Sequence, residues 1–154
     1  MPDPILSVPH VKQRDRGDCL AACGAMILTY FNIPVSYQQI SAALEIKEQI
    51  GAPSSNIRKL EIFGVEVLYQ QGTLTRLQEH LTMGQPCIAF VQTAELPYWQ
   101  EATGHAVVIV GLDDEFVYLN DPAFSTAPIQ VTHGDFDLAW LERDEFYAVI
   151  TRKL

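Results

Sequence analysis

Basic side chains are scarce in this sequence. It has 10 Lys and Arg residues against 19 Asp and Glu residues, which gives a formal net charge of −9 at pH 7. Nucleic acids and anionic membrane surfaces are bound through basic patches, so this balance argues against both kinds of partner. The charge weakly favours a basic or neutral peptide as a partner, and a role in solubility explains it about equally well.

Cysteine is also rare, and long apolar runs are missing. The three cysteines are an odd number without the spacing of a disulfide framework, so we expect a reducing compartment. The N-terminal stretch MPDPILSVPHV has no basic n-region and no long apolar core, which argues against a signal peptide. No apolar run approaches the ~20 residues that a membrane span needs. We therefore expect a soluble, cytoplasmic protein.

The sequence has no internal repeat, low-complexity tract or linker. Its 154 residues suit one domain and are enough to build a proper hydrophobic core. We therefore expect residues 1–154 to form a single domain.

The most informative stretch runs from Gln13 to Phe31 and reads QRDRGDCLAACGAMILTYF. Its polar part ends at Asp18, a good helix N-cap because its carboxylate can accept from the free N–H groups of the first turn. The mostly apolar residues behind it predict a central helix over 18–31 that is buried on all sides. Cys19 is then the first residue of that helix, where the positive end of the helix dipole favours a thiolate.

Cys19 also has a plainer interpretation, because free cysteines are usually buried and act as small hydrophobic side chains. Cys23 lies four residues on, so both sulfurs can face the same side of the helix. A Cys-x3-Cys pair without a second pair is weak evidence for zinc, and we expect neither a metal nor a cofactor. A nucleophilic role for Cys19 therefore depends on partners elsewhere in the chain.

The pattern of the whole chain is helices followed by strands. Helices are expected at 18–31, from Ser36 with Gln39 as its capping-box partner, at 56–63 up to Gly64, at 74–82 behind Thr73, and at 132–141. Strands are expected at 5–12 on an edge, and at 65–69, 87–91, 105–110, 115–119 and 145–151. This order predicts an α+β fold in which the leading helix packs against a largely antiparallel sheet.

Two residues at the ends of neighbouring strands qualify as partners of Cys19. His105 opens an apolar strand and Asp121 ends the next one, and a turn at residues 113–114 makes the two strands a hairpin. A carboxylate beside an imidazole fixes its tautomer and stabilises the imidazolium. The sequence therefore predicts a Cys19, His105 and Asp121 arrangement of the kind that thiol hydrolases use.

Gln13 is a fourth candidate, six positions before Cys19. Its amide can donate to a developing oxyanion together with the backbone N–H of Cys19. Each residue alone has an ordinary alternative role: a structural histidine for His105, a turn for Asp121 and Pro122, and a surface side chain for Gln13. Their joint occurrence favours the catalytic interpretation.

Three other histidines compete with His105, namely His10, His80 and His133. None of them is followed by a strand that ends in an acid, so His105 is preferred. His80 lies among polar helical residues, and we expect it to be solvated.

The loop that precedes His105, residues 92–104, is long and aromatic and reads QTAELPYWQEATG. We expect Tyr98 and Trp99 to border a substrate cleft. A packing role for Trp99 is the alternative.

Together these residues resemble cysteine peptidase family 39. The resemblance is carried by Gln-x5-Cys in QRDRGDCLAAC, by GHAVVIVGL, by the Val-x-x-x-Asp-Pro stretch VYLNDPA, and by Phe136 with Trp140. It covers residues 8–151 and includes the stretches VSYQQISAAL and GQPCIAFV. The best-known members are papain-like domains of bacteriocin-exporting transporters, which cleave leader peptides after a double glycine.

The resemblance implies a papain-like fold with Cys19 as nucleophile, His105 as general base and acid, Asp121 as orienting residue and Gln13 in the oxyanion hole. It also implies a peptide or protein substrate and an association with an export system. The chain departs from the family at Leu20, where a glycine usually follows the cysteine. We expect Leu20 to narrow the space beside the thiol and thereby to affect the range of substrates.

The transporter members continue into membrane and ATPase domains, so this chain resembles the freestanding branch of the family, for which leader cleavage is an analogy. Two functions stay open. The first is a thiol peptidase that works through an acyl-enzyme, with isopeptidase or amidase variants of the same chemistry. The second is a module of the same fold that binds a peptide or leader without cutting it.

Overall fold

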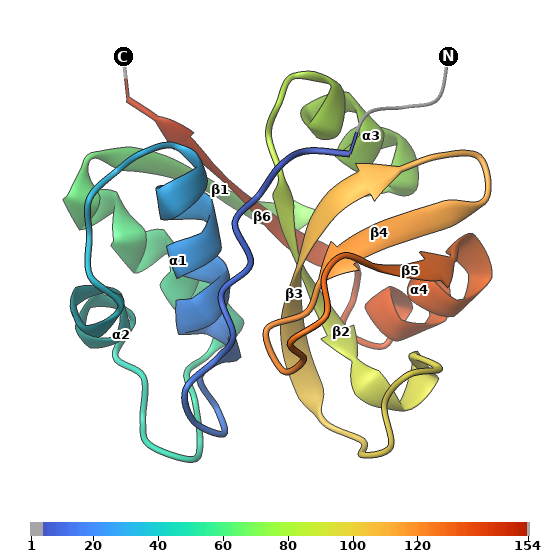
Figure 1. The fold of residues 1–154 in the computed structure, drawn as a ribbon, viewed down its shortest axis with the longest axis horizontal. Coiled ribbons are helices and arrows are strands. Elements are labelled where there is room, and N and C mark those ends of the chain that lie inside the picture. Colours follow the sequence, from blue (N-terminus) through green and yellow to red (C-terminus); the bar gives the residue numbers. More distant parts are fainter. Residues whose placement is uncertain (1–4, 154) are drawn as a thin grey trace.

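The computed structural model describes residues 5–153, which form a six-stranded antiparallel sheet with helices on both faces (Figure 1). The strand order is β1-β6-β2-β3-β4-β5. The elements are α1 (Cys19–Tyr30), α2 (Tyr37–Leu44), the 3₁₀ helix η1 (Ser54–Phe63), β1 (Val65–Gln71), α3 (Leu74–Thr82), β2 (Cys87–Gln92), the short 3₁₀ helix η2 (Thr93–Glu95), β3 (Gly104–Leu112), β4 (Phe116–Asn120), β5 (Ile129–Thr132), α4 (His133–Leu141) and β6 (Phe146–Arg152). The predicted α+β fold is confirmed. Within the described part of the chain, no helix combines the length and the apolarity needed to cross a membrane.

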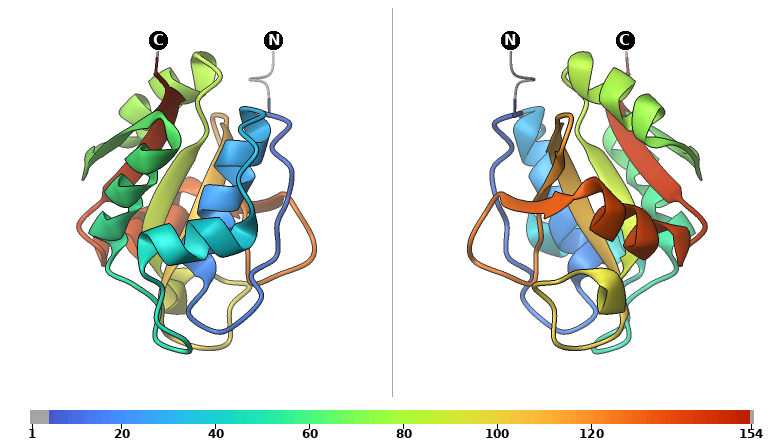
Figure 2. Two further views of the ribbon diagram at one scale, coloured as in Figure 1. Left: turned by 90° about the vertical axis from the view of Figure 1, so that its left-hand side faces the viewer. Right: turned by 90° about the vertical axis from the view of Figure 1, so that its right-hand side faces the viewer.

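The central strands bury both of their faces. Along β2, Ile88 and Phe90 belong to the core on one side of the sheet, and Cys87, Ala89 and Val91 belong to the core on the other side. This alternation follows from the strand geometry, because successive side chains point to opposite faces. Helices α1 and α2 lie over the first side, and α3 and α4 lie over the second (Figure 2).

Helix α1 is buried on all sides, as predicted. Every residue from 20 to 28 is buried. Gly24 allows its neighbours to approach closely, since a Cβ there would lie 3.2 Å from Leu60 Cδ1 and 3.3 Å from Ile40 Cγ2. Helices α2 and η1 therefore pack directly against the helix that begins with Cys19, which fixes the position of that residue.

Several local signals are confirmed. Gln39 N donates to Ser36 Oγ at 3.1 Å and Ser36 N donates to Gln39 Oε1 at 2.9 Å, which is the predicted capping box. Thr73 accepts from the backbone of Arg76 at the start of α3. Gly64 ends the third helix in the left-handed region at φ 83°, although that helix is a 3₁₀ helix and begins two residues earlier than predicted.

The edge strand predicted for residues 5–12 is wrong. Val8 N donates to Leu6 O at 2.9 Å, a tight turn that breaks an extended conformation, and Pro9 has no N–H for a ladder. Single hydrogen bonds hold the segment against the sheet instead. Leu6 N donates to Val110 O at 2.8 Å, and Asn120 Nδ2 donates to Val8 O at 3.1 Å.

Asp18 occupies the N-cap position of α1, but the predicted side-chain cap is wrong. Its Oδ2 atom accepts from the Tyr37 hydroxyl at 2.9 Å, so the carboxylate ties the start of α1 to the start of α2. The prediction that His80 is solvated is also wrong. Its Nδ1 lies 2.8 Å from Gln85 Oε1, and its Nε2 lies 3.1 Å from the Tyr147 hydroxyl.

Candidate active site

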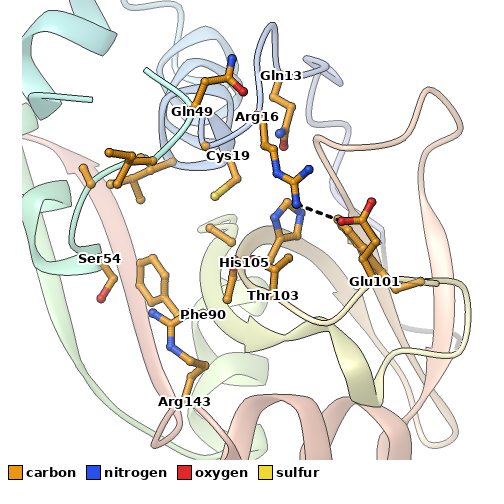
Figure 3. A pocket seen from close by; sticks show the side chains of 18 residues that line it. Gln13, Arg16, Cys19, Gln49, Ser54, Phe90, Glu101, Thr103, His105 and Arg143 are labelled. Carbon is orange, nitrogen blue, oxygen red and sulfur yellow. Dashed lines mark hydrogen bonds and ion pairs between the residues drawn. The ribbon is translucent and has the colours of Figure 1, made fainter. Parts of the chain in front are cut away.

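Three of the four candidate catalytic residues, Gln13, Cys19 and His105, come together where the N-terminus of α1 faces the first residues of β3 (Figure 3). In Figure 1 this is the lower end of the molecule, where the loops before α1 and before β3 approach each other. Gln13, Cys19 and His105 line one cleft of about 430 Å³. Asp121 follows β4 directly and lies against His105, away from the cleft lining.

His105 and Asp121 form a buried hydrogen bond. The distance from His105 Nε2 to Asp121 Oδ1 is 2.7 Å, and the two residues are 5% and 0% exposed. Val108 of β3 pairs with Asn120 of β4, so the position of β3 opposite Asp121 is residue 107. His105 lies two residues from that position and on the same face of β3. Burial lowers the pKa of His105, but the bonds to Asp121 and Cys19 and their charges raise it to about 9. A protonated imidazole is therefore favoured at neutral pH.

The Asp121 carboxylate accepts four hydrogen bonds. Its Oδ1 accepts from His105 and, at 2.9 Å, from the backbone N–H of Ala123. Its Oδ2 accepts from the Tyr98 hydroxyl at 2.7 Å and from Trp99 Nε1 at 2.8 Å. Burial raises the pKa of Asp121, but the bond from His105, the charge of His105 and the bonds from Trp99 and Ala123 bring it below its usual value. The carboxylate is thus held ionised beside the imidazole.

Leu20, Tyr98 and Trp99, the residues expected to contact substrate, do not all lie in the same place. Leu20 and Trp99 line the cleft, and the Trp99 ring stands edge-on to the His105 ring with 4.8 Å between their centroids. Tyr98 is not among the residues that line the cleft, and its hydroxyl donates to Asp121. The aromatic composition of the loop indicated that it belongs to the site, but composition carried no signal for its bonds to Asp121.

Cys19 differs electrostatically from the other cysteines. Burial raises the pKa of its thiol, but the hydrogen bond with His105, the charge of His105 and the N–H groups of Ala106 and Leu20 outweigh that effect and lower it. Cys23 and Cys87 are completely buried, and burial raises the pKa of both thiols. All three are free cysteines. Cys19 is therefore the one described cysteine whose environment favours a thiolate.

Gln13 is anchored on both its backbone and its side chain. Its backbone N–H donates to Pro122 O at 2.8 Å, which links it to the loop that carries Asp121. Its Nε2 donates to Asp15 O at 3.1 Å. Because a carboxamide nitrogen carries two hydrogens, this bond leaves one donor for another acceptor in the cleft.

An ion pair spans the rim of the cleft. Arg16 Nη2 lies 3.1 Å from Glu101 Oε2, so the loop before α1 is joined to the loop before β3 (Figure 3). Gly17, which follows Arg16 in the chain, has φ 90° and packs against Gly51, since a Cβ on Gly17 would lie 2.8 Å from the Gly51 nitrogen. These contacts were not predicted, because residues far apart in the sequence meet there without any shared pattern.

The other three histidines are engaged elsewhere. His10 Nε2 lies 2.6 Å from Phe124 O, His133 Nε2 lies 2.7 Å from Asp113 O, and His80 packs on Tyr147. None of the three lines the cleft with Cys19. In residues 5–153 no three His, Cys, Asp or Glu side chains converge as a set of metal ligands.

Comparisons with known proteins give one consistent result. The model of the peptidase C39 family matches residues 7–145. No curated protein matches the chain.

Solved structures resemble this fold over nearly the whole chain. A protein from Bacillus anthracis described as a C39-like peptidase has a TM-score of 0.81 at 19% identity, covering 98% of each chain. A double glycine motif protease from an AMS/PCAT transporter, solved in complex with the leader peptide, has a TM-score of 0.76 at 19% identity, covering 99% of each. The peptidase domain of Streptococcus ComA, an ABC transporter, has a TM-score of 0.76 at 17% identity, covering 94% of this chain and 98% of that one. At such identities the likeness establishes the fold, which is the predicted papain-like one.

Proposed function

The chain belongs to the peptidase C39 family, and we propose that it is a cysteine peptidase that hydrolyses a peptide bond through Cys19, His105 and Asp121. The observation that carries this proposal is the buried 2.7 Å bond from His105 Nε2 to Asp121 Oδ1 beside a thiol of lowered pKa. Because Nε2 is occupied by Asp121, Nδ1 is the imidazole nitrogen that exchanges a proton with Cys19. Transfer of that proton gives a thiolate on Cys19 beside an imidazolium on His105.

In the first half of the reaction, the Cys19 thiolate attacks the carbonyl carbon of the scissile bond. The new C–S bond pushes the π electrons onto oxygen, and the oxyanion accepts hydrogen bonds from the Cys19 backbone N–H and the second Nε2 hydrogen of Gln13. His105 gives its proton to the amide nitrogen as the C–N bond breaks. The products of this half are a free amine and a thioester on Cys19.

In the second half, His105 is neutral and takes a proton from water. The hydroxide oxygen adds to the thioester carbon, and collapse of the intermediate breaks the C–S bond. A carboxylic acid leaves, and the thiolate and imidazolium are restored. Asp121 keeps its charge throughout and stabilises the imidazolium in both halves.

We propose a peptide substrate, with cleavage of a leader after a double glycine as its most specific form. Support comes from the structural relative that was solved with its leader peptide and from the relative that is the peptidase domain of an ABC transporter. Association with an export system and a cytoplasmic location belong to the same proposal. Leu20 and Trp99 would contact the substrate from the walls of the cleft.

The test uses a peptidyl vinyl sulfone ending in glycine together with an internally quenched peptide that contains Gly-Gly. We expect the wild-type protein to be labelled at Cys19 and to cut the quenched peptide, and we expect His105→Ala to do neither. Cys19→Ala is the control for contaminating peptidases. Tight binding of the quenched peptide without cleavage or labelling would favour the binding module over the enzyme.

A further inference from the structure

Arg143 is a cleft residue to which the proposed chemistry gives no role. It lies in the turn between α4 and β6, and its half-buried side chain lines the cleft together with Cys19 and His105. Figure 3 shows it near Phe90 and across the cleft from Gln13. It therefore faces the space that a substrate would fill.

The guanidinium of Arg143 has no partner among the described residues. Every other arginine has one: Arg14 lies over the Tyr37 ring, Arg16 pairs with Glu101, Arg58 bonds to Tyr69 O, Arg76 pairs with Glu79, and Arg152 donates to Phe31 O. The chain has 19 acidic residues against 10 basic ones, so carboxylates are plentiful. A cleft arginine that no acidic residue of the described range 5–153 reaches is available for a group from outside the chain.

The guanidinium of Arg143 contacts the residue that precedes the catalytic histidine. A Cβ on Gly104 would lie 2.5 Å from Arg143 Nη1, so the guanidinium rests directly on the Gly104 backbone. Gly104 immediately precedes His105. A group held by Arg143 would consequently lie within a few residues of the scissile bond.

Among the described residues that line the cleft, Arg143 carries a positive charge that no neighbouring negative charge neutralises. Besides Cys19 and His105, whose opposite charges balance, the charged residues that line the cleft are Arg16, Glu101 and Arg143, and Arg16 and Glu101 neutralise each other at 3.1 Å. A guanidinium binds a carboxylate through two parallel hydrogen bonds, and partial burial strengthens both of them. The chemistry that best complements this end of the cleft is therefore an acidic side chain.

We propose that Arg143 determines specificity by binding an acidic side chain of the peptide substrate, a few residues from the scissile bond. This inference rests on the proposed function, since it names the class of peptide that the same site takes. It also differs from what the overall charge suggests. A net charge of −9 favours a basic or neutral peptide at long range, whereas Arg143 selects for a carboxylate at one position.

The experiment uses internally quenched peptides with Gly-Gly fixed and each other position occupied in turn by Glu, Gln or Lys. We expect Glu to exceed Gln at one position by about 10-fold or more in kcat/KM, as charge-assisted hydrogen bonds predict. Arg143→Gln should abolish this preference, and Arg143→Glu should reverse it in favour of Lys. The matched control is Arg152→Glu, the same change of charge at an exposed residue that does not line the cleft.

Binding measurements separate this inference from the proposed hydrolysis. The same peptides are titrated into Cys19→Ala, with and without Arg143→Gln, and followed by fluorescence anisotropy. If nothing is cleaved but Glu peptides bind more tightly than Gln peptides only when Arg143 is present, the hydrolysis fails and the role of Arg143 stands. Equal or absent binding of Glu and Gln peptides overturns the role of Arg143, and so does a Glu preference that survives Arg143→Gln.

Discussion

His105 Nε2 and Asp121 Oδ1 lie 2.7 Å apart in the interior of the protein, and the Asp121 carboxylate accepts three further hydrogen bonds. A buried negative charge that is held so firmly stabilises a positive charge on the imidazole, which explains why the pKa of His105 rises despite burial. The pKa of Cys19 falls at the same time. In an unperturbed pair the imidazolium loses its proton at a lower pH than the thiol does. Here the shifts in pKa reverse that order, so His105 and Cys19 are both charged over a common pH range.

This relationship predicts the basic limb of the pH profile. Below about 9, His105 keeps the proton that the leaving amine needs, so kcat/KM should fall as the pH rises through about 9. The negative charge of Asp121 raises the pKa of His105, so Asp121→Asn must lower it and move the basic limb to lower pH. Stopped-time assays from pH 5 to 10 on both proteins measure the shift. A basic limb that stays in place would show that Asp121 does not control the ionisation of His105.

The second prediction concerns thiol reactivity. Brief treatment with iodoacetamide near neutral pH should modify Cys19 first, because Cys19 has the lowered pKa and the partial exposure. Cys23 and Cys87 are completely buried and should react slowly. His105→Ala should slow the reaction of Cys19, since the imidazolium supports its thiolate. Peptide mapping by mass spectrometry identifies the modified residue, and earlier modification of Cys23 or Cys87 contradicts the assignment.

The third prediction separates oxyanion binding from thiolate formation. Gln13→Ala removes one donor to the oxyanion and should lower kcat by on the order of 10²–10³, while Cys19 is still alkylated quickly. Gln100→Ala is the matched control, because Gln100 is an exposed amide that does not line the cleft. If Gln13→Ala cleaves peptide as fast as the wild type, Gln13 has no part in the oxyanion hole.

The fourth prediction concerns the packing of the loop before Cys19 against the loop that contains Gly51. Gly17 has φ 90°, and a Cβ there would lie 2.8 Å from the backbone nitrogen of Gly51, which cannot move without the loop around it. Gly17→Ala should therefore cost roughly 1–3 kcal/mol in the free energy of unfolding. Gly134→Ala is the control, because a Cβ at Gly134 in α4 meets nothing within 4 Å. Urea unfolding of the two variants compares them, and equal stability would show that the loops adjust freely.

Much of the fold could be predicted because its signals are local or periodic. The two-sided apolar runs of β2 and β3, the Ser36 capping box and the apolar residues of α1 each satisfy a rule that holds within one element. Strand β5 was missed, since its four residues Ile-Gln-Val-Thr are too short and too polar to stand out. The strand predicted for residues 5–12 failed because alternation alone does not reveal a turn at Leu6 to Val8.

In the candidate site, too, residues at the ends of regular elements could be predicted and contacts between loops could not. Cys19, His105 and Asp121 could be brought together from sequence because each lies at the end of a regular element, and a hairpin joins the last two. The bonds from Tyr98 and Trp99 to Asp121 depend on the path of an irregular loop, which has no periodicity to read. The Arg16–Glu101 pair and the guanidinium of Arg143, which has no partner within residues 5–153, likewise depend on distances between loops.

The last prediction separates Tyr98 from Trp99. Both donate to Asp121 Oδ2, at 2.7 and 2.8 Å, but only Trp99 also lines the cleft, with its ring against that of His105. Tyr98→Phe leaves a buried carboxylate short of one donor, which should lower kcat about 10-fold with KM unchanged. Trp99→Phe should do the same, because an aromatic ring remains at the cleft wall.

Trp99→Ala removes that wall as well, so we expect KM to rise in addition to the loss in kcat. Steady-state kinetics on the three variants, with melting temperatures as the check on folding, measure the split between kcat and KM. A rise in KM for Tyr98→Phe equal to that for Trp99→Ala would put Tyr98 in contact with substrate, as its sequence context suggests. A large fall in the melting temperature of Trp99→Ala with kinetics intact would instead make Trp99 a packing residue.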